Sequence, residues 1–221
     1  MIYKEEFIEF LLKSGALNFG EFKLKSGRIA PYFINTGMFS TGFKLKKLGE
    51  YYAKAIKEYF SSDFDCIYGP AYKGIPICIS ASAALASMGI DKGYVFNRKE
   101  KKTYADKSLL VGMPLKKETR LIIVDDVITS GKAIRESIQI LEFCGKPKIK
   151  GIVISVNREE KGKTGKSALI ELEELLEVPV YSIITISDIK NYLHNKTIDG
   201  KIVIDDFMLS KINNYLEQYG A

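Results

Sequence analysis

The stretch LIIVDDVITSGKA, from Leu121 to Ala133, is the part of this sequence that decides the expected fold. Its first four residues are apolar and predict a buried parallel strand. Two adjacent carboxylates, Asp125 and Asp126, follow the strand, and a small polar turn then leads into a helical pattern. Backbone N–H groups of such a turn and of the helix N-terminus can bind a phosphate dianion. The stretch therefore predicts a site for a phosphorylated sugar.

The two carboxylates carry more information than the turn. A strand-to-helix turn capped by Thr129 or Ser130 would be ordinary. It does not explain Asp125 beside Asp126 at the end of a strand, where the two charges repel each other and one is partly buried. Carboxylates in this place can accept hydrogen bonds from sugar hydroxyls or hold a hydrated Mg²⁺ ion. We therefore interpret the acid pair as a binding element.

The apolar periodicity along the chain predicts strands that alternate with helices. Such alternation favours parallel βαβ units, and ligands of these sheets bind at the carboxyl ends of the strands. The 221 residues suffice for one α/β domain with small additions, a central and mostly parallel sheet flanked by helices. Helices are expected at 3–13, 43–60, 75–88, 133–144 and 167–176 and near the C-terminus, strands at 64–68, 93–97, 121–124, 149–156 and 180–184, and extended chain at 22–35.

Composition excludes several classes of protein. The net charge of +6 favours anionic partners, but lysine is spread along the whole chain and nucleic acid is not expected. The longest uncharged stretch, 74–90, is shorter than the roughly 20 apolar residues of a membrane span. Cys66, Cys78 and Cys144 have no metal-like spacing, so we expect core thiols in a reducing, cytoplasmic compartment.

Other candidate motifs also follow predicted strands or form turns. GPAYKGIP (69–76) is a turn that combines glycines with Lys73, and VNREEKG (156–162) places Arg158 where it can pair with a carboxylate. LKSGRIAPYFIN (24–35) places bases around a Ser-Gly turn before aromatic residues. FNRKEKKTYADK (96–107) is densely charged, and taken alone it resembles a solvated hairpin.

Together these motifs resemble those of one enzyme family. The acid-pair stretch is similar to the phosphoribosyl-diphosphate (PRPP) binding motif of type I phosphoribosyltransferases. The string K-S-G-R followed by P-Y-F at 25–33 resembles the hood of orotate phosphoribosyltransferases, and R-K-E-x-K at 98–102 resembles their mobile loop. Two positions depart from the family pattern: Tyr104 replaces a usual His, and Ile34 replaces a frequent second Phe.

The resemblance implies a type I phosphoribosyltransferase fold. Residues 1–40 would form an N-terminal helix and a hood over the base site, and 41–221 the core with a mobile loop at 98–110. The implied activity is that of a pentosyltransferase, which transfers the phosphoribosyl group of PRPP to orotate and gives orotidine 5′-monophosphate and diphosphate on the way to UMP. The implied enzyme is a homodimer with shared active sites. Mg²⁺ would be held mainly through PRPP, with water-mediated contacts to Asp125 and Asp126.

The resemblance also assigns roles to individual residues. Arg98, Lys99, Lys102 and Asp125 would be catalytic. Orotate would be bound by Lys25, Phe33, Ile34, Thr129 and Arg158. PRPP would be bound by Lys25, Tyr72, Lys73, Arg98, Lys99, Lys102, Asp125, Asp126, Val127, Ile128, Thr129, Ser130, Gly131, Lys132 and Ala133.

Two other functions share the acid-pair motif. One is a regulator that senses PRPP and binds nucleic acid, and the hood motif and the cations of 98–102 argue against it. The other is a phosphoribosyltransferase for purines or for another pyrimidine, which would lack the Lys25–Arg28 motif combined with Arg158. An assay that compares orotate with other bases as substrates distinguishes an orotate phosphoribosyltransferase from one that acts on another base.

Overall fold

The computed structural model describes residues 2–24, 27–98, 109–128, 131–162 and 165–221. Within these residues, six strands form one sheet in the order β5-β4-β3-β6-β7-β8, and every neighbouring pair is parallel except β4 with β5. The predicted α/β class is thus confirmed. The strands are β3 (Cys66–Gly69), β4 (Gly93–Asn97), β5 (Leu110–Gly112), β6 (Arg120–Asp125), β7 (Lys148–Asn157) and β8 (Val180–Thr185).

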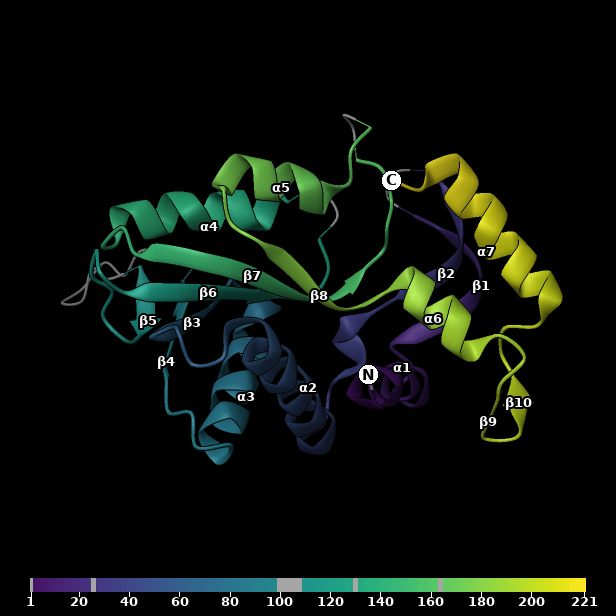
Figure 1. Ribbon diagram of the computed structural model, residues 1–221, viewed down its shortest axis with the longest axis horizontal. Coiled ribbons are helices and arrows are strands. Elements are labelled where there is room, and N and C mark those ends of the chain that lie inside the picture. The colour runs from purple at the N-terminus through teal and green to yellow at the C-terminus, as the bar shows by residue number, and fades with distance from the viewer. Residues whose placement is uncertain (1, 25–26, 99–108, 129–130, 163–164) are drawn as a thin grey trace.

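Helices cover both faces of the sheet, as Figure 1 shows. Helices α2 (Gly42–Phe60) and α3 (Gly74–Ser87) lie on one face, and α4 (Lys132–Phe143) and α5 (Ala168–Leu176) lie on the other. Side chains of β6 alternate between the two layers, so Ile122 and Val124 join one hydrophobic cluster while Leu121 and Ile123 join the other. Burial on both faces explains the continuous apolar run.

The two ends of the chain pack together beside the sheet. Helix α1 (Ile2–Lys13) leads into an antiparallel hairpin of β1 (Leu17–Lys23) and β2 (Ile29–Ile34), followed by a short 3₁₀ helix, Thr36–Met38. Helix α7 (Asp206–Tyr219) packs against β2. The chain between β8 and α7 forms α6 (Ile186–Leu193) and a small hairpin of β9 (Thr197–Ile198) and β10 (Lys201–Ile202).

Some local structure differs from the sequence-based expectation. The extended chain expected at 22–35 is found as the end of β1 and the whole of β2, but the hairpin to which they belong begins earlier, at Leu17. Strand β5 was not expected: Asn97 pairs with Leu110, and Arg98 N–H donates to the Leu109 carbonyl. The expected loop at 98–110 is therefore held in sheet hydrogen bonds at both ends. Its remaining part, 99–108, lies outside the described residues.

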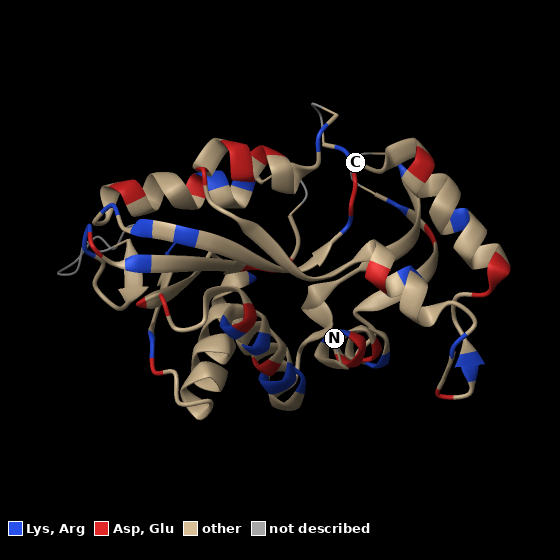
Figure 2. Ribbon diagram, viewed as in Figure 1, with Lys and Arg blue, Asp and Glu red and all other residues tan. Residues whose placement is uncertain are grey.

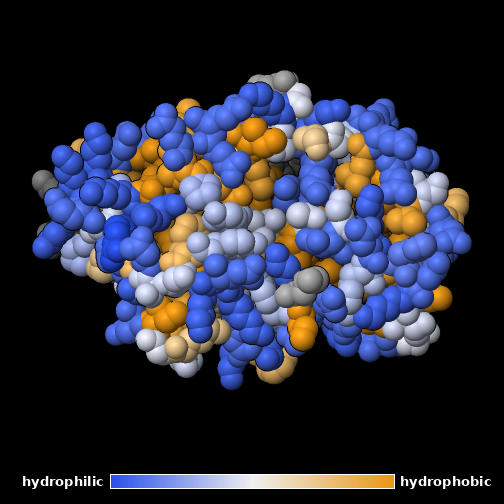
Figure 3. All heavy atoms as spheres, in the orientation of Figure 1, coloured by the Kyte–Doolittle hydropathy of each residue, from blue (hydrophilic) through white to orange (hydrophobic). Residues whose placement is uncertain are grey.

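The surface fits the expectations from composition. Figure 2 shows basic and acidic residues together on α1, α2, α4 and α7. The face in Figure 3 is largely hydrophilic, with apolar side chains visible between charged ones. Among the described helices, none has the length and apolar character needed to span a membrane. Cys66 and Cys78 are buried thiols as expected, whereas Cys144 is partly exposed.

Candidate active site

The acid pair lies at the carboxyl end of β6, and both residues are only 7% exposed. Its backbone is fixed from two neighbouring elements. The hydroxyl of Tyr52 in α2 donates to the Asp125 carbonyl at 2.6 Å. Ser155 in β7 donates to the Asp126 carbonyl through its backbone N–H at 2.8 Å and through Oγ at 2.5 Å. The position of the pair therefore depends on both helical packing and strand pairing.

The two carboxylates have different surroundings. Asp126 Oδ2 accepts hydrogen bonds from Lys73 Nζ at 2.8 Å and from Thr36 Oγ1 at 2.7 Å. Asp125 Oδ1 accepts from the N–H of Asp126 at 2.9 Å. Burial, with the neighbouring Asp126 charge, raises the pKa of Asp125 to about 7, although the Asp126 N–H and Lys73 oppose the rise. The charge of Asp126 is thus balanced by Lys73, whereas Asp125 has a pKa near neutral pH.

The turn from β3 to α3 supplies Lys73. Close approach of the turn to the helix requires glycine at 69, because a Cβ atom there would overlap the Gly74 carbonyl oxygen. Asn97 at the end of β4 fixes the turn, since its Oδ1 accepts from the N–H of Ala71 and from the hydroxyl of Tyr68, each at 2.9 Å. Tyr72, predicted to bind PRPP, is 66% exposed beside Lys73.

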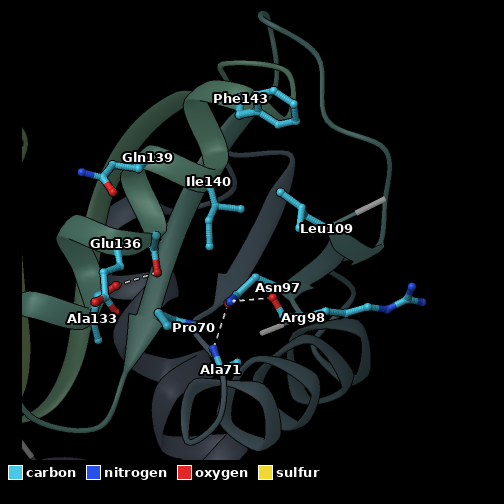
Figure 4. Close-up of a pocket in the computed structure, with 11 residues that line it drawn as sticks. Pro70, Ala71, Asn97, Arg98, Leu109, Ala133, Glu136, Gln139, Ile140 and Phe143 are labelled. Carbon is cyan, nitrogen blue, oxygen red and sulfur yellow. Dashed lines mark hydrogen bonds between the residues drawn. The ribbon is translucent and has the colours of Figure 1, made fainter. Parts of the chain in front are cut away.

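A hollow lies between this turn, the end of β4 and α4 (Figure 4). Pro70, Ala71 and Asn97 line one side of it, and Ala133 and Ile140 of α4 line the other. The side chain of Arg98 extends away from this group in Figure 4. The chain then continues into 99–108, so the predicted catalytic residues Lys99 and Lys102 lie outside the described residues.

The start of α4 carries the predicted phosphate-binding turn. Gly131 precedes the helix with a left-handed backbone, φ 65°, and provides no side-chain cap for the first N–H groups. Such N–H groups form an anion-binding site. Ile128 is buried, Val127 packs on the core, and Lys132 is exposed within 3.7 Å of Glu136. Thr129 and Ser130 are outside the described residues.

The predicted orotate residues fall into two groups. Phe33 is 38% exposed and stacks on Phe22 with ring centroids 5.5 Å apart, whereas Ile34 packs against the hydrophobic core. Neighbouring strand residues point to opposite faces, so the side chain of Phe33 lies on the exposed face of the hairpin and that of Ile34 on the face toward the core. Lys25 lies outside the described residues.

Arg158 lies just after β7 and is largely buried. Its Nη2 donates to Glu160 Oε1 at 2.6 Å, and its guanidinium lies over the Tyr32 ring at 5.5 Å. Burial lowers the pKa of Arg158, but the Glu160 charge beside it reverses the effect and leaves the pKa raised. Arg158 was predicted to pair with a carboxylate, and in this structure it pairs with that of Glu160.

The structure joins Lys73 directly to Asp126 and adds residues that sequence reasoning missed. Thr36, Tyr52 and Ser155 belong to none of the predicted motifs, and Glu160 lies within VNREEKG but received no role there. Among the described residues, no group of three or more His, Cys, Asp or Glu side chains could hold a metal ion. Two neighbouring carboxylates suit a hydrated cation that is also bound by a ligand.

A parallel sheet with an acid pair at a strand end, followed by a glycine turn and a helix, is the architecture of a phosphoribosyltransferase. Residues 42–178 match the family model for the phosphoribosyl transferase domain. The chain is 47% identical over 220 residues to orotate phosphoribosyltransferase of Clostridium botulinum (strain Alaska E43 / Type E3), with 99% of this chain and 98% of that relative covered.

Two further comparisons agree. The chain is 48% identical over 220 residues to orotate phosphoribosyltransferase of Clostridium acetobutylicum, again with 99% and 98% covered. A crystal structure of orotate phosphoribosyltransferase from Francisella tularensis matches with a TM-score of 0.84 and 37% identity, covering 98% of this chain and all of that one. The chain belongs to the orotate phosphoribosyltransferase family.

The raised pKa of Asp125 predicts a pH-dependent stability. The ordinary pKa is 3.8 and the folded value is about 7, so the folded protein binds the proton more tightly than the unfolded chain does. Stability therefore falls as the pH rises from about 4 to 7, by at most about 4 kcal/mol for this group. Asp125→Asn removes this loss of stability, because asparagine does not ionise, and it keeps an oxygen that can accept from the Asp126 N–H.

Urea denaturation without ligands, at several pH values, measures the effect. We expect the variant to be more stable than the original protein at pH 8, with the difference shrinking toward pH 4. A variant that is less stable at pH 8, or a difference independent of pH, contradicts the assignment.

Proposed function

We propose that this protein catalyses the transfer of the 5-phosphoribosyl group from PRPP to orotate, forming orotidine 5′-monophosphate and diphosphate. The observation that carries the proposal is the buried acid pair, placed between Lys73 and the start of α4. The family membership of the whole chain supports it. The free thiols of the described cysteines fit the reducing cytoplasm as the place of the reaction.

PRPP would bind across the carboxyl ends of β3 and β6. Asp125 and Asp126 accept hydrogen bonds from the ribose hydroxyls, and the N–H groups of residues 129–133 hold the 5′-phosphate. Lys73, which already pairs with Asp126, adds positive charge on the side of the diphosphate, where Tyr72 is exposed. Val127, Ile128 and Lys132 complete this segment of the site.

Mg²⁺ fits this site as an ion carried in by PRPP. The acid pair offers hard oxygen ligands that can be reached through water, without a protein cage. When bound, the ion would neutralise charge on the departing diphosphate. The protein itself contributes the orientation of the ribose and the exclusion of water.

Orotate would be oriented by its carboxylate. Arg158 is the cation that would receive it, and Lys25, Phe33, Ile34 and Thr129 would surround the ring. Orotate N1 is the nucleophile once deprotonated, so the chain needs little acid–base chemistry. Positioning and charge would lower the barrier.

The reaction itself is tested by a product assay. Purified protein with PRPP and Mg²⁺ is supplied in turn with orotate, uracil, adenine and hypoxanthine, and the nucleotides formed are separated. We expect turnover with orotate at least a hundredfold above that with the other bases. Preference for another base overturns the substrate assignment, and no turnover with any base overturns the proposed activity.

Arg158→Ala should raise the KM for orotate far more than the KM for PRPP. Loss of a charge-assisted pair costs about 2–3 kcal/mol, or roughly a 30- to 150-fold change. Steady-state kinetics with each substrate varied in turn measures the difference. Arg120→Ala, at the opposite end of β6, serves as a control that should leave both KM values unchanged. Equal increases for both substrates would show that Arg158 is not the carboxylate partner.

Lys102→Ala should lower kcat strongly with smaller effects on binding, because negative charge on the diphosphate grows as its bond to C1 breaks.

We propose that Arg98, Lys99 and Lys102 act in the active site of the neighbouring subunit of a homodimer. Mixing Lys102→Ala with an inactive Asp125→Asn protein then creates one site with both defects and one intact site. Activity should return, to about half of the original per heterodimer. No recovery despite proven subunit exchange places the loop over its own subunit's site.

A further inference from the structure

Glu160 lies in a buried polar cluster that the proposed reaction does not explain. Its Oε1 atom accepts two hydrogen bonds, from the Tyr32 hydroxyl at 2.9 Å and from Arg158 Nη2 at 2.6 Å. The side chains of Glu160 and Arg158 are only 14% and 15% exposed, and Tyr32 is fully buried. A carboxylate so far removed from water is expensive unless its partners are well placed.

The cluster joins the predicted hood to the end of β7. Tyr32 is in β2, and Arg28, which precedes that strand, has Nη1 3.8 Å from Glu160 Oε2. The guanidinium of Arg28 also lies over the ring of Tyr219 in α7, 4.7 Å from its centroid. The C-terminal segment holds the chain around Glu160, since Lys161 N–H donates to the Tyr219 carbonyl at 2.7 Å. Three distant parts of the sequence therefore fix this one carboxylate.

Arg158 is only partly satisfied by this arrangement. Glu160 takes a single N–H from the guanidinium, and Arg158 Nε is buried without a hydrogen-bond partner among the described residues. A buried donor without a partner costs free energy that a suitable acceptor would recover. Because guanidinium presents several donors in one plane, a second carboxylate can be bound while the first remains.

We propose that Glu160 is a positioning residue for substrate recognition, which holds Arg158 by one nitrogen so that its remaining donors are oriented for the carboxylate of orotate. This inference rests on the proposed function, in which Arg158 receives that carboxylate. Glu160 Oε1 also accepts from Tyr32 in the hood strand β2. The same oxygen atom therefore positions both the hood strand, which would form the wall of the base site, and Arg158, which would be its cation. The role requires an acceptor at this place and not a negative charge as such.

Two substitutions separate geometry from charge. Glu160→Ala removes the acceptor, and we expect the KM for orotate to rise about tenfold while the KM for PRPP changes less than twofold. Glu160→Gln keeps an oxygen for both hydrogen bonds, and it should restore the KM for orotate to within about threefold of the original value. Steady-state kinetics with each substrate varied measures both.

A matched control is available in α1. Glu9 also accepts from a tyrosine hydroxyl, that of Tyr192 at 2.8 Å, and pairs with Lys13 at 3.3 Å, but it lies outside the proposed site. Glu9→Ala should leave both KM values unchanged. In an Arg158→Ala background, Glu160→Ala should add no further rise in the KM for orotate, because the residue acts through Arg158.

The outcomes are distinguishable from failure of the proposed function. If the original protein does not use orotate, the function fails, whatever the variants do. If it does, an unchanged KM for orotate in folded Glu160→Ala, equal changes for both substrates, or no rescue by Gln each overturns the positioning role. Should Glu160→Ala not fold, Tyr32→Phe removes one hydrogen bond to Glu160 and should raise the KM for orotate about threefold, with that for PRPP unchanged.

Discussion

Two carboxylates held side by side and almost out of water impose the main constraint on this molecule. Placing Asp125 next to Asp126 at 7% exposure is unfavourable, because burial and the neighbouring charge both oppose ionisation and raise the pKa of Asp125. Lys73 and Thr36 compensate at the Asp126 side chain, and hydrogen bonds to both backbone carbonyls hold the pair in place. A turn with only a structural role would need none of these contacts, which supports our proposal that the pair binds a ligand.

The compensating groups come from elements that are far apart in sequence. Thr36 follows the hood hairpin, Tyr52 is in α2, Lys73 immediately precedes α3, and Ser155 is in β7. Lys73 and Ser155 reach the acid pair because parallel strands β3 and β7 flank β6 and run to the same edge of the sheet, and Thr36 and Tyr52 come from elements packed beside that edge. Arg158, just beyond the end of β7, lies at the same edge. The sheet topology is thus the device that assembles the site.

The sequence was sufficient for the parts of the molecule that depend on local patterns. The apolar run before Asp125 predicted β6, and the helix at 133–144 is α4 within one residue at either end. Strand β5 was missed because three residues after a charged segment carry no periodic signal. The partners of the acid pair were missed for a different reason. Thr36 lies 90 residues from Asp126, and no spacing rule connects a hydroxyl to a carboxylate across such a distance.

Glu160 shows how a charged residue can be passed over. The motif VNREEKG indicates a role for Arg158 and none for the two acids that follow it. Only the fold brings Tyr32 to Glu160, across 128 residues, and makes it a buried carboxylate. Phe33 and Ile34 show the reverse case, in which two neighbours in one motif have different surroundings because side chains alternate along a strand.

The central claim is that the acid pair binds the ribose of PRPP. Titration calorimetry with PRPP and Mg²⁺ on the Asp125→Asn, Asp126→Asn double variant tests it most directly, with Asp63→Asn, at the amino-terminal side of the sheet, as the control. Circular dichroism establishes that each protein is folded. We expect PRPP binding to be lost in the double variant and retained in the control. An unchanged PRPP affinity in the folded double variant would contradict it.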